Sequence, residues 1–116
     1  MDIYHIWCDL KPGVRDIEFV NAAKQYFEIL LSDATLANYR ITRRKLGLAS
    51  RELGEFHIML EFEGLAELDQ AFKLVSTRAD PVESFHHAVN SLTTSLSFAL
   101  YRDFPDSQRR TGEEKF

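Results

Sequence analysis

Residues 56–63, FHIMLEFE, alternate between two kinds of side chain more clearly than any other stretch of the chain. One set of positions is apolar: Phe56, Ile58, Leu60 and Phe62. The other set is mostly polar: His57, Met59, Glu61 and Glu63. Successive side chains of a β-strand point to opposite faces of its sheet, so this period of two predicts a strand with one buried face.

Three further segments have the composition of strands. Residues 3–10 are rich in aromatic and β-branched side chains and stop at the turn signal Pro12-Gly13. Residues 37–45 and 95–104 alternate between apolar and polar positions, which is typical of strands that are covered on one face. The chain therefore offers four strands.

Helical spacing of apolar residues appears in the segments between the strands. A helix is predicted from Asp16, as its N-cap, to about Leu31, with the buried positions Val20, Ala23, Phe27, Leu30 and Leu31. A second is predicted over 65–76, with the buried positions Leu65, Leu68, Ala71, Phe72 and Val75. A third is predicted near 81–92, with Pro81 at its first position and the apolar residues Val82, Phe85, Val89 and Leu92.

The order of these elements is βαββααβ, which becomes the ferredoxin-like βαββαβ pattern when the extra helix is left out. This predicts an α+β fold with a four-stranded antiparallel sheet, in the spatial order fourth, first, third and second strand. The helices cover one face and leave the other open. We assign residues 1–104 to a single domain and 105–116 to a polar C-terminal tail.

Strand parity indicates which side chains occupy the open face. They are His5, Trp7, Asp9, Arg40, Thr42, Arg44, His57, Met59, Glu61, Ser97, Ala99 and Tyr101. The expected register places His5 beside Glu61 and Arg40 in one row. It places Trp7, Met59 and Thr42 in the next row, and Asp9, His57 and Arg44 in a third.

A central Trp7–Met59 patch rimmed by charged residues favours a protein interface over a solvated face. We therefore predict a homodimer in which two sheet faces pack together into a barrel. Its predicted interface residues are His5, Trp7, Arg40, Thr42, His57, Met59, Glu61 and Tyr101.

Composition restricts the partners. The net charge is −4, and only the RITRRK segment is locally basic, so we expect no nucleic-acid partner. The sequence shows no apolar stretch of transmembrane length and no signal peptide, so we expect no membrane partner and a cytoplasmic location. The single cysteine, Cys8, is expected to be a small buried group, and we expect no cofactor and no metal.

The segments HIWCDLKPGV, DIEFVNAAKQYFEIL and FHIMLEFEGLAELDQAF resemble the dimeric α/β-barrel superfamily, and most of all its stress-responsive A/B-barrel branch. The resemblance covers about residues 3–104 and implies the barrel dimer. In the cyclase members a strand histidine comes seven positions before the lysine of the Lys-Pro-Gly turn. That position here is Tyr4, and the adjacent His5 faces the opposite way, so no catalytic residue is assigned.

Four residues could share a cavity between sheet and helices, where cyclase members of that family bind: Tyr4, Tyr26, Tyr39 and His86. Ordinary core packing is the alternative for all four. His5 with Glu61 could be a general base and its partner, or an interfacial ion pair. A metal held by His5, His57 and Glu61 is disfavoured, because the expected register places the two histidines in different rows.

Two functions remain open. The protein could bind or transform a small, largely apolar molecule without a cofactor, or it could be a non-catalytic dimeric structural or stress-related domain. No sequence mark of haem chemistry or of flavin-free oxygenase chemistry is present. The loop over 46–55, with glycines near both ends, is expected to be the most mobile internal segment.

Overall fold

The computed structural model describes residues 1–33 and 35–109. Its elements run in the order β1 (Asp2–Leu10), α1 (Asp16–Ser32), β2 (Asn38–Arg43), β3 (Phe56–Phe62), α2 (Leu65–Ser76), α3 (Val82–Asn90) and β4 (Thr93–Arg102). This is the predicted βαββααβ order, extra helix included.

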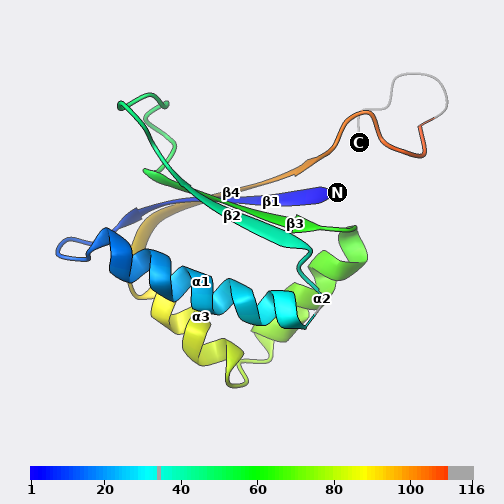
Figure 1. Cartoon of the computed structure of the whole chain (residues 1–116), viewed down its shortest axis with the longest axis horizontal. Helices are drawn as coiled ribbons and strands as arrows, with labels where there is room; N and C mark the ends of the chain where they lie inside the picture. The colour runs from blue at the N-terminus through cyan, green and yellow to red at the C-terminus, as the bar shows by residue number, and fades with distance from the viewer. Residues whose placement is uncertain (34, 110–116) are drawn as a thin grey trace.

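The four strands form one antiparallel sheet in the order β2-β3-β1-β4, as the sequence predicts. Figure 1 shows the sheet nearly edge-on, with α1, α2 and α3 all beneath it and no helix above it. The α+β, ferredoxin-like architecture with an open sheet face is therefore confirmed.

The edges of the elements differ slightly from those expected. Asp16 is the first helical residue of α1, and Arg15 takes the N-cap position without a side-chain hydrogen bond. The Asp16 carboxylate instead accepts a hydrogen bond from the backbone N–H of Ile17 at 2.7 Å. At the other end of the domain, β4 begins at Thr93, two residues before the predicted start, and this extension places Thr93 in the sheet.

The predicted register of β1 on β3 is wrong by two residues. His5 lies opposite Met59, not Glu61, and Trp7 lies opposite His57. Arg40 is paired with Met59 and Thr42 with His57, so the predicted register of β2 on β3 is wrong by the same two residues. A shift of two residues leaves every side chain on the face that parity assigned to it, so the faces are as predicted although the rows are not.

The core lies between β3 and α1. Phe56, Ile58, Leu60 and Phe62 are all buried, as the alternation predicts. Helix α1 contributes Phe19, Ala23, Tyr26, Phe27 and Leu30 to the same core.

Helix α2 buries less than its apolar stripe predicts. Only Leu68 and Ala71 are buried, whereas Leu65 and Phe72 are 62% and 49% exposed. Figure 1 shows α2 descending from the end of β3 at the side of the α1–α3 layer, so one side of α2 has no neighbouring element. The predicted buried stripe of α2 is therefore correct at Leu68 and Ala71 and wrong at Leu65 and Phe72.

Two segments extend from the sheet on the side away from the helices: the loop between β2 and β3, and residues 103–109 after β4 (Figure 1). Leu46 and Leu48 in the first segment are 84% and 79% exposed. In the second, Asp106 forms an ion pair with Arg102 at 2.9 Å. Of the predicted tail, residues 110–116 lie outside the described residues.

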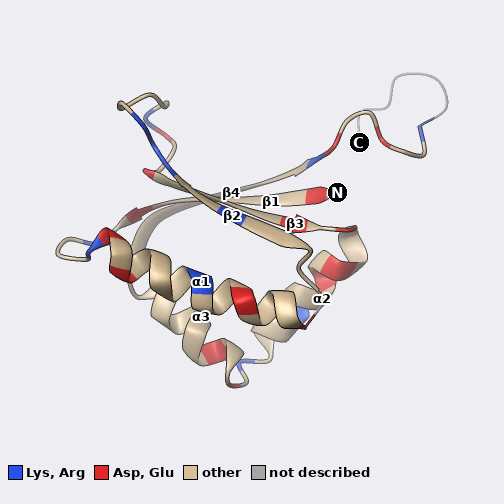
Figure 2. Cartoon of the chain, viewed as in Figure 1, with Lys and Arg blue, Asp and Glu red and all other residues tan. Residues whose placement is uncertain are grey.

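Charged side chains lie mainly on helix surfaces, on loops and on the edge strand β2, as Figure 2 shows. The inner strands β1 and β3 carry charge near their ends, at Asp2, Asp9 and Glu61. Among the helices that the structure describes, none is long and apolar enough to span a membrane.

Candidate functional site

A partly open cavity of about 510 Å³ lies between the sheet and the helices. The strands supply Tyr4, Ile6, Cys8, Ile58, Leu60, Phe62, Thr93, Leu96 and Phe98 to its wall. The helical side supplies Phe19, Tyr26, Phe27, Leu30, Ala71, Phe72, Val75, Ser76, Arg78, His86, Val89 and Asn90. Most of these side chains are apolar or aromatic, so the cavity suits a ligand that is itself largely apolar.

Aromatic rings frame the open side of this cavity. Tyr4 stacks on Phe98, with ring centroids 5.8 Å apart, and meets Phe72 edge-on at 5.4 Å. Phe98 and Phe72 are 55% and 49% exposed, which identifies them as the rim. Burial raises the pKa of Tyr4, so its phenol keeps its proton at neutral pH.

Tyr26 and His86 form a second aromatic pair on the helical wall. Their ring centroids are 5.5 Å apart and the rings meet edge-on. Burial, followed by the negative charge of Glu83, raises the pKa of Tyr26 to about 12. Tyr26 therefore offers the cavity a neutral hydroxyl, and His86 offers an imidazole.

The structure brings together three of the four residues predicted to share this cavity, Tyr4, Tyr26 and His86. Tyr39 does not line it. It lies on the edge strand β2, where its hydroxyl donates a hydrogen bond to Glu28 at 2.8 Å and its ring packs on Phe27. The strand order explains the difference, because β3 and β1 separate β2 from the cavity rim on β4.

Sequence reasoning missed four polar members of the wall, Ser76, Arg78, Asn90 and Thr93, and only Thr93 among them is buried. Thr93 is 6% exposed, and its Oγ1 has no hydrogen-bond partner among the described residues. The predicted strand began at residue 95, although the β-branched pair at 93 and 94 could have extended it. Cys8, which is 1% exposed, lies on the same wall. Burial, followed by the charge of Asp9, raises the pKa of its thiol to about 11.

The open face carries a cluster of rings at its centre. Nδ1 of His5 and Nε2 of His57 are 2.8 Å apart and share a hydrogen bond. Trp7 stacks on His57 with ring centroids 4.5 Å apart, and Tyr101 meets His5 edge-on at 5.0 Å. Contrary to the expected register, the two histidines are therefore neighbours, and His5 is not opposite Glu61.

The environment of the histidine pair favours the neutral form of both rings. Burial lowers the pKa of His5, and burial together with the charge of His5 lowers the pKa of His57. The Nε2 atom of His5 is buried without a partner in the described part of the chain. Residues 1–33 and 35–109 contain no group of three or more His, Cys, Asp or Glu side chains placed to hold a metal ion.

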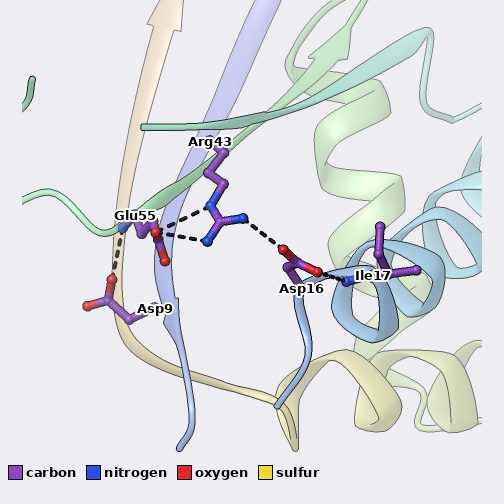
Figure 3. A network of polar contacts seen from close by, with 5 residues as sticks. All are labelled: Asp9, Asp16, Ile17, Arg43 and Glu55. Carbon is purple, nitrogen blue, oxygen red and sulfur yellow. Dashed lines mark hydrogen bonds and ion pairs between the residues drawn. The ribbon is translucent and has the colours of Figure 1, made fainter. Parts of the chain in front are cut away.

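A polar network fixes the base of the β2–β3 loop, as Figure 3 shows. Arg43 forms an ion pair with Asp16 of α1 at 2.9 Å and another with Glu55 at 3.2 Å. The backbone N–H of Glu55 donates to the Asp9 carboxylate at 2.8 Å. The three contacts connect β2, α1, β1 and the end of the loop.

A model of one protein family, described as "Family of unknown function (DUF6614)", matches residues 1–116. No curated protein matches the sequence. Solved structures are similar in fold at low sequence identity. One is protein At3g17210 from Arabidopsis thaliana, with a TM-score of 0.71 and 12% identity over 92% of this chain and 99% of that chain.

Two other neighbours differ in their descriptions. SnoaB from Streptomyces nogalater, a cofactor-independent oxygenase, has a TM-score of 0.63 and 7% identity over 93% of this chain and 95% of that chain. A dimeric ferredoxin-like protein of unknown function from Thermobifida fusca has a TM-score of 0.56 and 15% identity over 87% and 90%. The fold is thus shared by an oxygenase and by a dimeric protein of unknown function.

Proposed function

This chain belongs to DUF6614, a family of unknown function, and we propose that it binds a small, largely apolar molecule between its sheet and its helices without a cofactor. The observation that carries the proposal is the cavity of about 510 Å³ with its mostly apolar wall. Ligand sites in proteins commonly have volumes of about 300–1,000 Å³ and such linings. We further propose that the chain is part of the stress-responsive A/B-barrel branch, acting in the cytoplasm.

The lining explains why the ligand is mostly apolar. Phe19, Ile58 and Phe62 in the wall are at most 2% exposed, and they offer no hydrogen bond to water in the cavity. Water in an apolar cavity lacks the two to four polar partners that it normally requires. Displacing such water with apolar ligand surface is favourable by about 25 cal/mol per Å² of apolar area buried.

Chemistry on this ligand would draw on few groups. His86 places an imidazole on the cavity wall, and imidazole is the side chain that most often serves as a general acid or base. Tyr26 beside it retains its proton and can donate a hydrogen bond. The oxygenase SnoaB shows that a protein of this fold can act without a cofactor, which supports the idea but does not specify a reaction.

The same proposal includes a homodimer through the open face. Trp7, Met59 and the two histidines on its central strands form a half-buried patch that is flanked by Arg40 and Glu61. The β2–β3 loop and residues 103–109 after β4 extend on this side of the sheet and would flank a second copy (Figure 1). A specific interface typically buries about 800 Å² per partner. Dimeric ferredoxin-like neighbours support this arrangement.

Filling the cavity tests the binding function. Ala71 of α2 is 4% exposed and lines the cavity, so Ala71→Phe should occupy part of it. The neutral fluorescent probe N-phenyl-1-naphthylamine should bind the unmodified protein and lose about tenfold or more in affinity to Ala71→Phe. Ala66→Phe adds the same side chain at an exposed position of the same helix and serves as the control.

The outcome distinguishes the two functions left open by the sequence. Probe binding that Ala71→Phe removes and Ala66→Phe retains supports a ligand-binding protein. An unmodified protein that binds neither this probe nor any member of a panel of apolar aromatic compounds would overturn the proposal and leave a non-catalytic dimeric domain.

A further inference from the structure

The hydroxyl of Thr93 stands out among the groups that line the cavity. Thr93 is 6% exposed, and its Oγ1 is buried without a hydrogen-bond partner in the described part of the chain. Buried side-chain hydroxyls almost always have a partner, so each exception asks for an explanation. Here the residue also lines the cavity.

The strand geometry fixes Thr93 in this position. It is the first residue of β4 and pairs with Leu10 at the end of β1. Lys11, the next residue, donates its backbone N–H to the carbonyl of Leu92 at 2.9 Å, which closes the strand pair beside Thr93. The hydroxyl is thus carried by paired backbone and not by a loose loop.

Nearby protein groups do not satisfy this hydroxyl. Cys8 lies two residues before Leu10 on β1, on the same side of the sheet as Thr93, and its thiol is protonated at neutral pH. A thiol is a weak donor and a weak acceptor, and no hydrogen bond links it to Thr93. A hydroxyl can donate one hydrogen bond and accept two, so Thr93 has its full capacity available.

The other polar side chains of the wall, among them Tyr26 and His86, have no atom that is both buried and unpaired in the described part of the chain. Arg78 is 75% exposed in its side chain and forms an ion pair with Glu83 at 3.4 Å. Asn90 is exposed to solvent. The rim residues Phe72, Leu96 and Phe98 are apolar. Among the polar residues of the wall, Thr93 is therefore the one with a hydroxyl that is buried and unpaired in the described part of the chain.

We propose that Thr93 Oγ1 selects the ligand of this cavity, which is a neutral alcohol, phenol or ketone with an otherwise apolar body. The inference rests on the proposed binding function and adds a specificity-determining residue to it. The ligand's single polar group exchanges a hydrogen bond with Thr93, and its body packs against the aromatic wall. A site with a buried polar group favours the matching ligand and rejects an analogue that leaves the group unpaired.

A matched pair of ligands and variants tests this role. 2-Naphthol and 2-methylnaphthalene have nearly the same shape, but only the first can hydrogen-bond through its substituent. Their affinities are measured by displacement of N-phenyl-1-naphthylamine from the full-length protein. Thr93→Val keeps the side-chain volume and removes the hydroxyl, whereas Thr93→Ser keeps the hydroxyl. Thr94→Val, at an exposed neighbour on β4, is the control.

Thr93→Val should weaken 2-naphthol binding about 2- to 10-fold, the range expected for one neutral hydrogen bond, and should change 2-methylnaphthalene binding by less than twofold. Thr93→Ser and Thr94→Val should retain the preference of the unmodified protein. If circular dichroism shows that Thr93→Val is unfolded, Thr93→Ala provides the same comparison.

Equal weakening of both ligands, or of neither, by the variants that lack the hydroxyl would overturn the role of Thr93 and leave the cavity as a binding site. Failure of both ligands and of the probe to bind the unmodified protein would overturn the binding function as well.

Discussion

The two faces of the sheet are built from the same strands but solve the packing problem differently. On the face beneath the sheet, small side chains such as Cys8 of β1 and Ala71 of α2 meet large ones, and a cavity of about 510 Å³ remains. On the open face, the rings of His5, Trp7 and His57 contact one another directly. One face thus provides room for a small molecule, and the other provides a solid patch for a protein surface.

Each face has a buried polar atom, in a ring cluster or on a cavity wall, that is unpaired among the described residues. Beneath the sheet it is Thr93 Oγ1 on the cavity wall, and in the ring cluster of the open face it is His5 Nε2; Arg44 Nε and Glu83 Oε2 are also unpaired among the described residues. Buried polar atoms normally have hydrogen-bond partners, so the unpaired atoms of Thr93 and His5 each point to a binding partner that is absent from the single chain. For Thr93 we infer a ligand. For His5 the partner in our proposal is a second copy of the chain.

The largest expected effect comes from Trp7 and should separate the two faces. Trp7→Ala should weaken the dimer by about 2 kcal/mol or more, because a central tryptophan commonly dominates an interface. Trp7→Glu should weaken it further, because the new carboxylate would be buried without a partner. Sedimentation velocity measures the dimer, and N-phenyl-1-naphthylamine binding should stay within about twofold because Trp7 does not line the cavity.

Lys11→Ala at the exposed turn is the control, and it should leave the dimer unchanged. An unmodified protein that is monomeric at high micromolar concentration would contradict the arrangement. So would a Trp7→Glu protein that dimerises as well as the unmodified one.

Alternation was enough to predict the faces of the strand residues on β1, β2 and β3, but not of Thr93 on β4, where the register against β1 is irregular. It could not predict the register of β1 on β3, because a shift of two residues preserves every face and therefore leaves no trace in the pattern. Only the paired backbone shows that His5 meets Met59 and that the two histidines touch. The interface residues could be proposed from the sequence, but the histidine pair could not.

The cavity was harder to predict from the sequence than the strand register. An apolar pattern on a strand and a helix predicts that the two pack together, but it does not state whether the space between them is filled. Tyr4, Tyr26 and His86, which a family resemblance grouped together, line the same cavity, whereas Tyr39 lies on the distant edge strand. Thr93 was missed because the predicted strand began at residue 95, and because a register irregularity between β1 and β4 reverses the alternation before Ser97 and places Thr93 on the cavity side.

A change at Gly54 should disturb both faces together. A Cβ atom at this position would lie 2.6 Å from the carbonyl carbon and oxygen of Cys8, and backbone atoms cannot move away cheaply. Cys8 lines the cavity, and the loop that ends at Gly54 extends on the open side of the sheet. Gly54→Ala should therefore lower the free energy of unfolding by about 1–3 kcal/mol, as overpacking typically does.

Urea unfolding measures this effect, and Gly64→Ala is the matched control. A Cβ at Gly64 would meet only the flexible end of Glu67, at 3.5 Å, so little loss is expected there. Equal stability of the Gly54→Ala and unmodified proteins would show that the loop does not need to approach β1 this closely.

The smallest expected effect is the pH dependence of the histidine pair. Folding lowers the pKa of both His5 and His57 below the ordinary value of 6.5, chiefly through burial. Below about pH 6.5 the unfolded chain therefore binds more protons than the folded chain, and stability decreases as the pH falls. The hydrogen bond between the rings survives protonation of one ring and is lost when both are protonated, because it requires one unprotonated nitrogen. Glu61, Arg40 and Tyr101 lie on the same face and modulate the size of the effect.

The urea midpoint should fall between pH 7 and pH 5, and the double variant His5→Gln/His57→Gln should flatten this dependence. The control variant His87→Gln, at an exposed position of α3, should leave the pH dependence of the urea midpoint unchanged. A double variant that retains the full pH dependence would show that the open face does not sense pH through this pair.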